Sequence, residues 1–160
     1  MKNLTIIRHG KSGYELGLAD KQRKLTETGI ENSIAIAKQY LQYLPNDFNI
    51  VSSSAIRAQM TAQIFAKAIG ISEEKIQLLD DLYTFNVREF EQIIKLTNNE
   101  IHNLLVFCHN DAITDFINKF GGIAIDNVPT SGLVSINFDV DYWTNIKNGI
   151  IIKTIFPSKE

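Results

Sequence analysis

The chain has 160 residues, of which 44% are hydrophobic and 21% are charged, and its formal net charge is −2 at pH 7. This length predicts one domain, residues 1–160, that can bury a core without disulfides or metals. The weak negative charge and the lack of a polybasic cluster argue against nucleic acid or a membrane surface as a partner. Cys108 is the single cysteine, which excludes an intramolecular disulfide. Since no secretory signal or membrane-spanning run is visible, we expect a cytoplasmic protein.

The first third of the chain predicts a strand, a loop and a helix. Residues 3–8 (NLTIIR) are apolar and β-branched, which predicts a buried strand that ends before Gly10. Residues 11–25 are polar and read as a loop. A helix is expected from Thr26 or Thr28, because Thr28 and Glu31 have capping-box spacing. Its expected apolar stripe is Ile30, Ile34, Ala37, Leu41 and Leu44.

The middle of the chain repeats this alternation. Residues 48–53 (FNIVSS) predict a second strand, and the serines at 52–54 offer an N-cap for a helix that runs to about Ile69 and ends at Gly70. Residues 75–83 predict a shorter strand and a turn, and residues 87–97 predict a third helix.

The last third predicts the most buried strand, 103–109 (NLLVFCH), and then a helix with Ile113, Phe116, Ile117 and Phe120 on one face. Residues 132–140 and 149–156 predict two strands that pair antiparallel, because their connection is short. The alternation predicts an α/β fold: a three-layer αβα sandwich with a mostly parallel central sheet and an antiparallel C-terminal portion.

Polar residues follow three of the predicted parallel strands. The first strand ends at Arg8-His9-Gly10, the second leads to Arg57 one turn into a helix, and the buried strand ends at His109-Asn110. Ligands of such sheets bind beyond the carboxyl ends of the strands, where helix N-termini also favour anions. Arginine matches the oxygens of a phosphoryl group, and a neutral histidine can carry that group covalently. We expect Gly10 to let the substrate approach the backbone closely.

Three segments resemble the signature of the histidine phosphatase superfamily: RHG at 8–10, SSAIRAQMTA at 53–62 and CHN at 108–110. The RHGKS start, RKLTETG at 23–29 and the small size are most similar to the SixA-like phosphohistidine phosphatase branch. The resemblance implies the phosphoglycerate-mutase-like fold and a phosphatase that needs no metal or cofactor.

The resemblance also implies roles for individual residues. His9 is the expected nucleophile, Arg8 and Arg57 the ligands of the phosphoryl oxygens, and His109 the residue that completes the site. Arg23 is a candidate for the rim of the site. Ser12 and Asn110 are further candidates for phosphate contacts, although the sequence does not decide whether Ser12 bonds locally instead.

Two alternatives concern the chemistry. A cysteine-based phosphatase would need an arginine six residues after Cys108, but Thr114 stands there, so we expect Cys108 to be a buried strand residue. Larger members that the chain resembles, such as the mutases, use a carboxylic acid to protonate the leaving group, and no carboxylate here matches their pattern. Asp111 reads as a helix cap. The other acidic candidates are Glu15, Asp20, Asp80, Asp81 and Glu89.

The lack of an obvious acid favours phosphohistidine as the substrate, because imidazole is a better leaving group than an alcohol. The expected partner is therefore a phosphorylated protein. A small phosphate monoester and a catalytically silent phosphate-binding or phosphoprotein-binding module remain the alternatives. The sequence predicts no oligomeric state.

Overall fold

The computed structural model describes residues 1–158 and contains a six-stranded sheet with the order β3-β2-β4-β1-β5-β6. β1 pairs parallel with β4, and β2 pairs parallel with β4 and β3, whereas β5 runs antiparallel to β1 and β6. The mostly parallel sheet with an antiparallel C-terminal portion is thus confirmed. The strands are β1 (Lys2–Arg8), β2 (Asn49–Ser53), β3 (Ile76–Leu79), β4 (Asn103–Cys108), β5 (Leu133–Phe138) and β6 (Ile150–Ile155).

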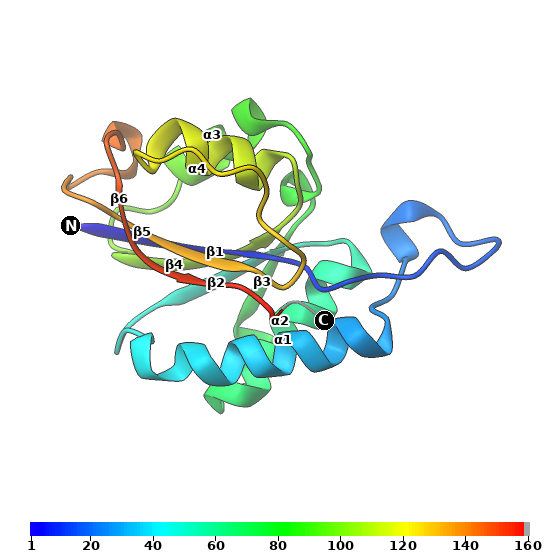
Figure 1. The fold of residues 1–160 in the computed structure, drawn as a ribbon. Helices are drawn as coiled ribbons and strands as arrows, with labels where there is room; N and C mark the ends of the chain where they lie inside the picture. The colour runs from blue at the N-terminus through cyan, green and yellow to red at the C-terminus, as the bar shows by residue number, and fades with distance from the viewer. Residues whose placement is uncertain (159–160) are drawn as a thin grey trace.

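Helices cover both faces of the sheet, which confirms the three-layer sandwich (Figure 1). One layer holds α1 (Glu27–Tyr40) and α2 (Ile56–Ile69), and the other holds α3 (Val87–Lys95) and α4 (Ala112–Phe120). Short 3-10 turns interrupt the connections, among them η1 (Asp20–Gln22) after β1 and η4 (Asp80–Leu82) after β3. Within residues 1–158, no helix combines the length and apolar character that crossing a membrane requires.

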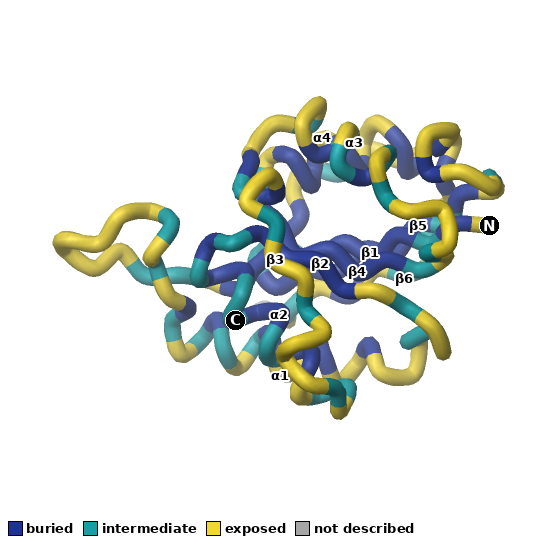
Figure 2. Tube along the Cα trace, turned by 180° about the vertical axis from the view of Figure 1, so that it is seen from behind, coloured by how far each residue is buried: buried dark blue, intermediate teal, exposed yellow. Residues whose placement is uncertain are grey.

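The core lies in two layers that meet at β4. Val106 and Cys108 belong to the cluster on the side of α3 and α4, whereas Leu105 and Phe107 belong to the cluster on the side of α1 and α2. Because side chains of a strand alternate between faces, burial of both sets requires an apolar run without alternation. This explains why the segment 103–108 was the most easily predicted strand (Figure 2).

Two details of the helices differ from the sequence-based expectations. α1 is capped by Thr26, whose hydroxyl accepts a hydrogen bond from the N–H of Gly29, and not by Thr28. Its buried face holds Gly29, Ser33, Ile36, Ala37 and Tyr40, while Ile34 is 38% exposed and Leu41 is 40% exposed. The predicted stripe was right at Ala37 but wrong at Ile34 and Leu41, because Gly29 and Ser33 pack against the segment that follows β1.

The N-terminus of α2 also differs, since Ala55 occupies the N-cap position and makes no side-chain cap bond. Ser53 accepts a hydrogen bond from the N–H of Ala55, but it also contacts His109. The serines were predicted to cap this helix. Ser53 instead connects its start to the end of β4. Gly70 ends the helix in the left-handed conformation, as expected.

The start of α1 lies directly against the backbone that follows β1. A Cβ atom on Gly10 would come within 2.8 Å of the Ser33 hydroxyl and 2.9 Å of the Gly29 carbonyl oxygen. Gly10 therefore makes room for α1, and the expectation that it makes room for substrate is wrong. The backbone N–H of Gly10 donates to Thr61 of α2, so both helices hold this segment.

We predict that Gly29→Ala destabilises the fold, because its Cβ would lie 2.2 Å from the carbonyl oxygen of Lys11. The helix must then move away from residues 10 and 11, at a cost of about 1–3 kcal/mol in the free energy of unfolding. The control is Gly13→Ala, whose Cβ would meet only Thr26 at 3.9 Å. Urea denaturation measures both, and equal stability of the two variants would contradict the close approach.

Candidate functional site

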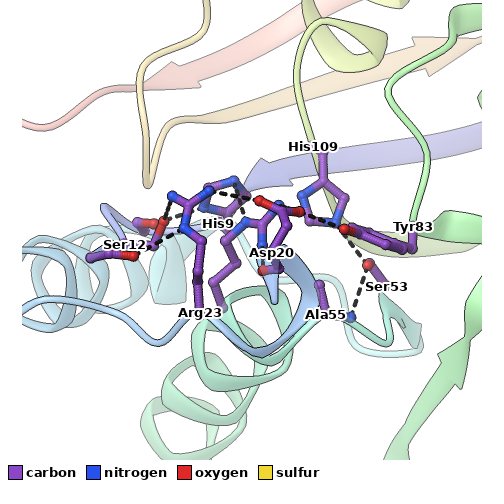
Figure 3. A network of polar contacts seen from close by, with 11 residues as sticks. His9, Ser12, Asp20, Arg23, Ser53, Ala55, Tyr83 and His109 are labelled. Atoms are coloured by element: carbon purple, nitrogen blue, oxygen red, sulfur yellow. Dashed lines mark hydrogen bonds and ion pairs between the residues drawn. The ribbon is translucent and has the colours of Figure 1, made fainter. Parts of the chain in front are cut away.

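The two histidines lie side by side because the strands before them pair in register. Arg8 of β1 is opposite Cys108 of β4, so the next residues, His9 and His109, leave the same edge of the sheet. Their ring centroids are 5.1 Å apart (Figure 3). Arg57 reaches this edge from the first turn of α2, and its Nε lies 3.3 Å from Nε2 of His9. The structure therefore brings three of the predicted catalytic residues together.

Hydrogen bonds define the tautomer of His9. Nδ1 lies 2.7 Å from the carbonyl oxygen of Gly10. A carbonyl can only accept, so Nδ1 carries the proton and donates it. Nε2 then holds the lone pair, and it accepts the N–H from Nε of Arg57. The nitrogen that faces the arginine is therefore the one that can act as a nucleophile.

Burial keeps both rings neutral. His9 is 7% exposed and His109 is 1% exposed. Burial disfavours the charged imidazolium and, together with the charges of the nearby arginines and against the effect of the bond to Gly10, lowers the pKa of His9 to about 4. Burial likewise lowers the pKa of His109 to about 2, with added effects of His9 and Arg57. At neutral pH the lone pair of His9 is thus available.

Arg8 lies near the two histidines, but its guanidinium is held by a backbone carbonyl group. Its Nη1 donates to the carbonyl oxygen of Val128 at 2.8 Å, and its positive charge helps to lower the pKa of both histidines. Among the residues that the structure describes, Nε of Arg8 and Nδ1 of His109 are buried without a hydrogen-bond partner. Such atoms are costly unless a ligand or water satisfies them, which makes them candidate contacts for an oxyanion.

Three further residues surround the histidines: Ser53 and Tyr83 were not predicted to belong to the site, and Asp20 was only one of several acidic candidates. Ser53, at the end of β2, has its hydroxyl 2.8 Å from Nε2 of His109. Tyr83 packs its ring against His109 with centroids 5.5 Å apart, and its hydroxyl donates to Asp20 (Figure 3). Asp20 had been considered only as a general acid; its carboxylate accepts a hydrogen bond from Nη2 of Arg57 at 3.0 Å.

The remaining candidates hold the neighbouring loops. Arg23 donates to the carbonyl oxygen of Gly13 at 3.0 Å, to Asp20 at 2.8 Å and to the hydroxyl of Ser12. Because Arg23 is bonded to Asp20 and to the loop at Gly13, it lies at the rim of the site. Ser12 bonds locally, to Arg23. Contacts of Arg23 and Ser12 with phosphate stay predictions.

Asn110 connects the end of β4 to two other segments. Its amide nitrogen donates to Asn127 and Val128, and its amide oxygen accepts from the backbone N–H of Thr114. It therefore caps α4 from the position before Asp111. Asp111 occupies the N-cap position, but its side chain makes no cap bond, so the expected capping role of Asp111 was wrong.

Cys108 points away from the histidines, into the core beneath α3 and α4. Its thiol donates to the carbonyl oxygen of Leu82 at 3.2 Å, and burial raises its pKa to about 12. A thiolate nucleophile is therefore unfavourable here. Among residues 1–158, no group of three or more His, Cys, Asp and Glu side chains is arranged to hold a metal ion.

We predict that His9 and His109 stay neutral from pH 7 down to pH 5, because burial lowers the pKa of His9 to about 4 and that of His109 to about 2. Histidines of the unfolded chain take up protons near their ordinary pKa of about 6.5. The free energy of unfolding should therefore fall as the pH drops from that value toward 4.

NMR titration of the imidazole signals, assigned with His9→Gln and His109→Gln, measures this directly. Protonation of either ring near pH 6.5, the ordinary histidine value, would contradict the proposed burial effect.

We predict that Cys108→Ser keeps the chemistry of the site, since the serine hydroxyl can donate to Leu82 in place of the thiol. The assay is turnover of p-nitrophenyl phosphate at matched concentrations of folded protein, with circular dichroism as the control for folding. Loss of turnover in a folded variant would assign a chemical role to the thiol.

Comparisons with known proteins identify the family and the fold of the chain. The sequence profile of the histidine phosphatase superfamily (branch 1) matches residues 4–102. No curated protein sequence matches the chain significantly.

Several solved structures have the same fold. The structure assigned as the phosphohistidine phosphatase SixA of Agrobacterium tumefaciens has 24% identity and a TM-score of 0.81 over 98% of this chain and 99% of that chain. The protein histidine phosphatase SixA complexed with tungstate has 20% identity and a TM-score of 0.80 over 97% of each chain. A mycobacterial glucosyl-3-phosphoglycerate phosphatase has 11% identity and a TM-score of 0.71 over 99% of each chain.

These structures establish the similarity of fold, and the profile establishes the family, because it covers more than half of the sequence. The chain belongs to the histidine phosphatase superfamily.

Proposed function

We propose that the protein is a metal-independent phosphatase that transfers a phosphoryl group to His9 and then to water, and that its substrate is a phosphohistidine protein. The observation that carries the proposal is the environment of His9. Its Nδ1 is held by Gly10, its Nε2 faces Arg57, and its ring is neutral. A neutral, oriented imidazole beside guanidinium groups suits nucleophilic attack on phosphorus.

The reaction has two steps. The lone pair of His9 Nε2 forms a bond to phosphorus while the bond between phosphorus and the substrate nitrogen breaks. The leaving imidazole keeps the electron pair and takes a proton from solvent. Water then attacks the phosphorus on His9, which releases inorganic phosphate and restores the neutral ring. Arg57 and Arg8 stabilise the charge on the phosphoryl oxygens in both steps.

The preference for phosphohistidine rests on the charge of Asp20. The hydroxyl of Tyr83, followed by Arg23 and Arg57, holds the pKa of the Asp20 carboxyl well below its usual range. Asp20 is therefore ionised at neutral pH and is a poor proton donor for an alkoxide. Among the acidic candidates from the sequence, all within the described residues, only Asp20 hydrogen-bonds to Arg57. An imidazole leaving group depends less on such a donor.

A protein partner is supported by the loop between β1 and α1, which projects from the body of the molecule (Figure 1). Residues 14–20 of this loop are exposed, including the large apolar side chains of Tyr14, Leu16 and Leu18. Arg23 and Asp20 connect this loop to the site. Exposed apolar side chains beside a reaction site favour contact with a macromolecule. The likeness to SixA proteins agrees with this choice, and the likeness to a sugar-phosphate phosphatase supports a small ester as the second candidate.

We predict that p-nitrophenyl phosphate is turned over equally with and without a chelator, and that His9→Ala lowers turnover by about 10³-fold or more because it removes the nucleophile. The control is His102→Ala, because His102 is exposed and lies just before β4, at the end of the strand opposite to the site. Loss of activity with the chelator would contradict the metal-independent mechanism. Tight phosphate binding without turnover would indicate the binding module instead.

The substrate class is tested by a panel of a phosphohistidine peptide, a histidine-phosphorylated protein, sugar phosphates and phosphoglycerates. We expect kcat/KM for the phosphohistidine substrates to exceed that for the esters by about 10²-fold, the usual contribution of a general acid that the esters lack here. A higher kcat/KM for one of the esters would favour the small-molecule function.

A further inference from the structure

Asp20 accepts four hydrogen bonds, from Arg57, Arg23 and Tyr83. Its carboxylate accepts hydrogen bonds from Nη2 of Arg57 at 3.0 Å, from Nη1 of Arg23 at 2.8 Å and from the hydroxyl of Tyr83. Its backbone carbonyl accepts a further bond from Nη1 of Arg57 at 2.7 Å. The carboxylate therefore connects the loop after β1 with α2 and with the turn after β3 (Figure 3).

The N–H groups of the Arg57 guanidinium point to two different partners. Nη1 and Nη2 donate to Asp20, and Nε donates to Nε2 of His9. Each Nη carries a second N–H, so donors remain for the oxygens of a phosphoryl group on His9. Arg57 therefore contacts His9 and Asp20 at the same time.

An arginine side chain has many rotamers, and fixing it has an entropic cost. A group that is held in place before the reaction stabilises the transition state without that cost during the reaction. Arg57 is 3% exposed and its charge needs a nearby anion in the free protein. Asp20 holds the Arg57 side chain in one orientation and supplies the anion that its charge needs.

We propose that Asp20 is a positioning residue that holds Arg57 in the orientation that binds the transition state, with Arg23 and Tyr83 holding the Asp20 carboxylate. The inference rests on the proposed function, since it takes Arg57 to bind the phosphoryl group. It adds that the orientation of Arg57 is set by a loop residue.

Two other roles for Asp20 make different predictions. As an internal competitor, the carboxylate would occupy the place of the substrate anion, and its neutralisation would strengthen the binding of oxyanions. As a general acid, it would matter most for substrates with strongly basic leaving groups.

The test is Asp20→Asn, which keeps the size of the side chain and the backbone carbonyl but removes the charge. The matched control is Asp80→Asn. Asp80 pairs at 3.3 Å with Lys21, the neighbour of Asp20 in η1, and its side chain is 82% exposed. Both variants are compared with the unaltered protein for kcat and KM on p-nitrophenyl phosphate and phenyl phosphate, and for the Kd of vanadate by calorimetry.

We expect Asp20→Asn to lower kcat by about 10-fold or more on both esters, with a smaller change in KM, and to weaken vanadate binding by a similar factor. Asp80→Asn should stay within about twofold of the unaltered protein, as ordinary surface substitutions do. Tyr83→Phe removes one donor to Asp20 and should give a smaller loss, and its effect should be largely absent when Asp20 is already Asn.

Several results would overturn the proposal. These are tighter vanadate binding in Asp20→Asn, a loss that is larger for phenyl phosphate than for p-nitrophenyl phosphate, or unchanged kcat and vanadate affinity. Failure of the proposed function is a separate result. In that case the unaltered protein would bind vanadate without turnover, and the change in vanadate affinity would still decide the role of Asp20.

Discussion

The hydrogen bond from Nδ1 of His9 to the carbonyl oxygen of Gly10 is the contact on which the chemistry of this site depends. It spans 2.7 Å and joins neighbouring residues, so the local backbone fixes the tautomer of the ring. The opposite nitrogen is left with its lone pair directed toward Arg57. Burial completes the effect, because it prevents the protonation that would occupy this lone pair at neutral pH.

The same backbone segment is held by the fold at several points. β1 lies between β4 and β5, Gly10 packs against α1, and its N–H donates to Thr61 of α2. His9 therefore projects from the centre of the fold, while Asp20, which pairs with Arg57 and Arg23, comes from the loop after β1. A chain with a net charge of −2 thus gathers Arg8, Arg23 and Arg57 at one edge of its sheet, where they favour an anion.

The sequence was sufficient to predict the order and type of the main elements, because the strands are apolar runs and polar or glycine-containing segments, such as the one at Gly70, separate them from the helices. It also placed His9, Arg57 and His109 at one edge, since parallel strands share the direction of their carboxyl ends. Their roles in catalysis stay predictions that the proposed assays test.

The remaining parts of the site depend on contacts between distant segments. Asp20 and Tyr83 meet although they are 63 positions apart in the sequence, and no local pattern marks Tyr83. The spacing of Asp20 and Arg23 is that of a local ion pair, which could have indicated that the loop is ordered. The buried face of α1 also depends on a distant segment. Ser33 is buried there and its hydroxyl forms a hydrogen bond with that of Ser131, which the sequence of the helix does not indicate.

The most direct test of the mechanism is to trap the phosphoenzyme. The protein is mixed with p-nitrophenyl phosphate, quenched in base within milliseconds and analysed by mass spectrometry, with NMR of the trapped species to identify the nitrogen. The account predicts a transient phosphoryl group on Nε2 of His9, formed in a burst that matches the enzyme concentration. A phosphoryl group on any other residue, or release of p-nitrophenol with no phosphoenzyme under conditions in which hydrolysis of the intermediate limits turnover, would contradict it.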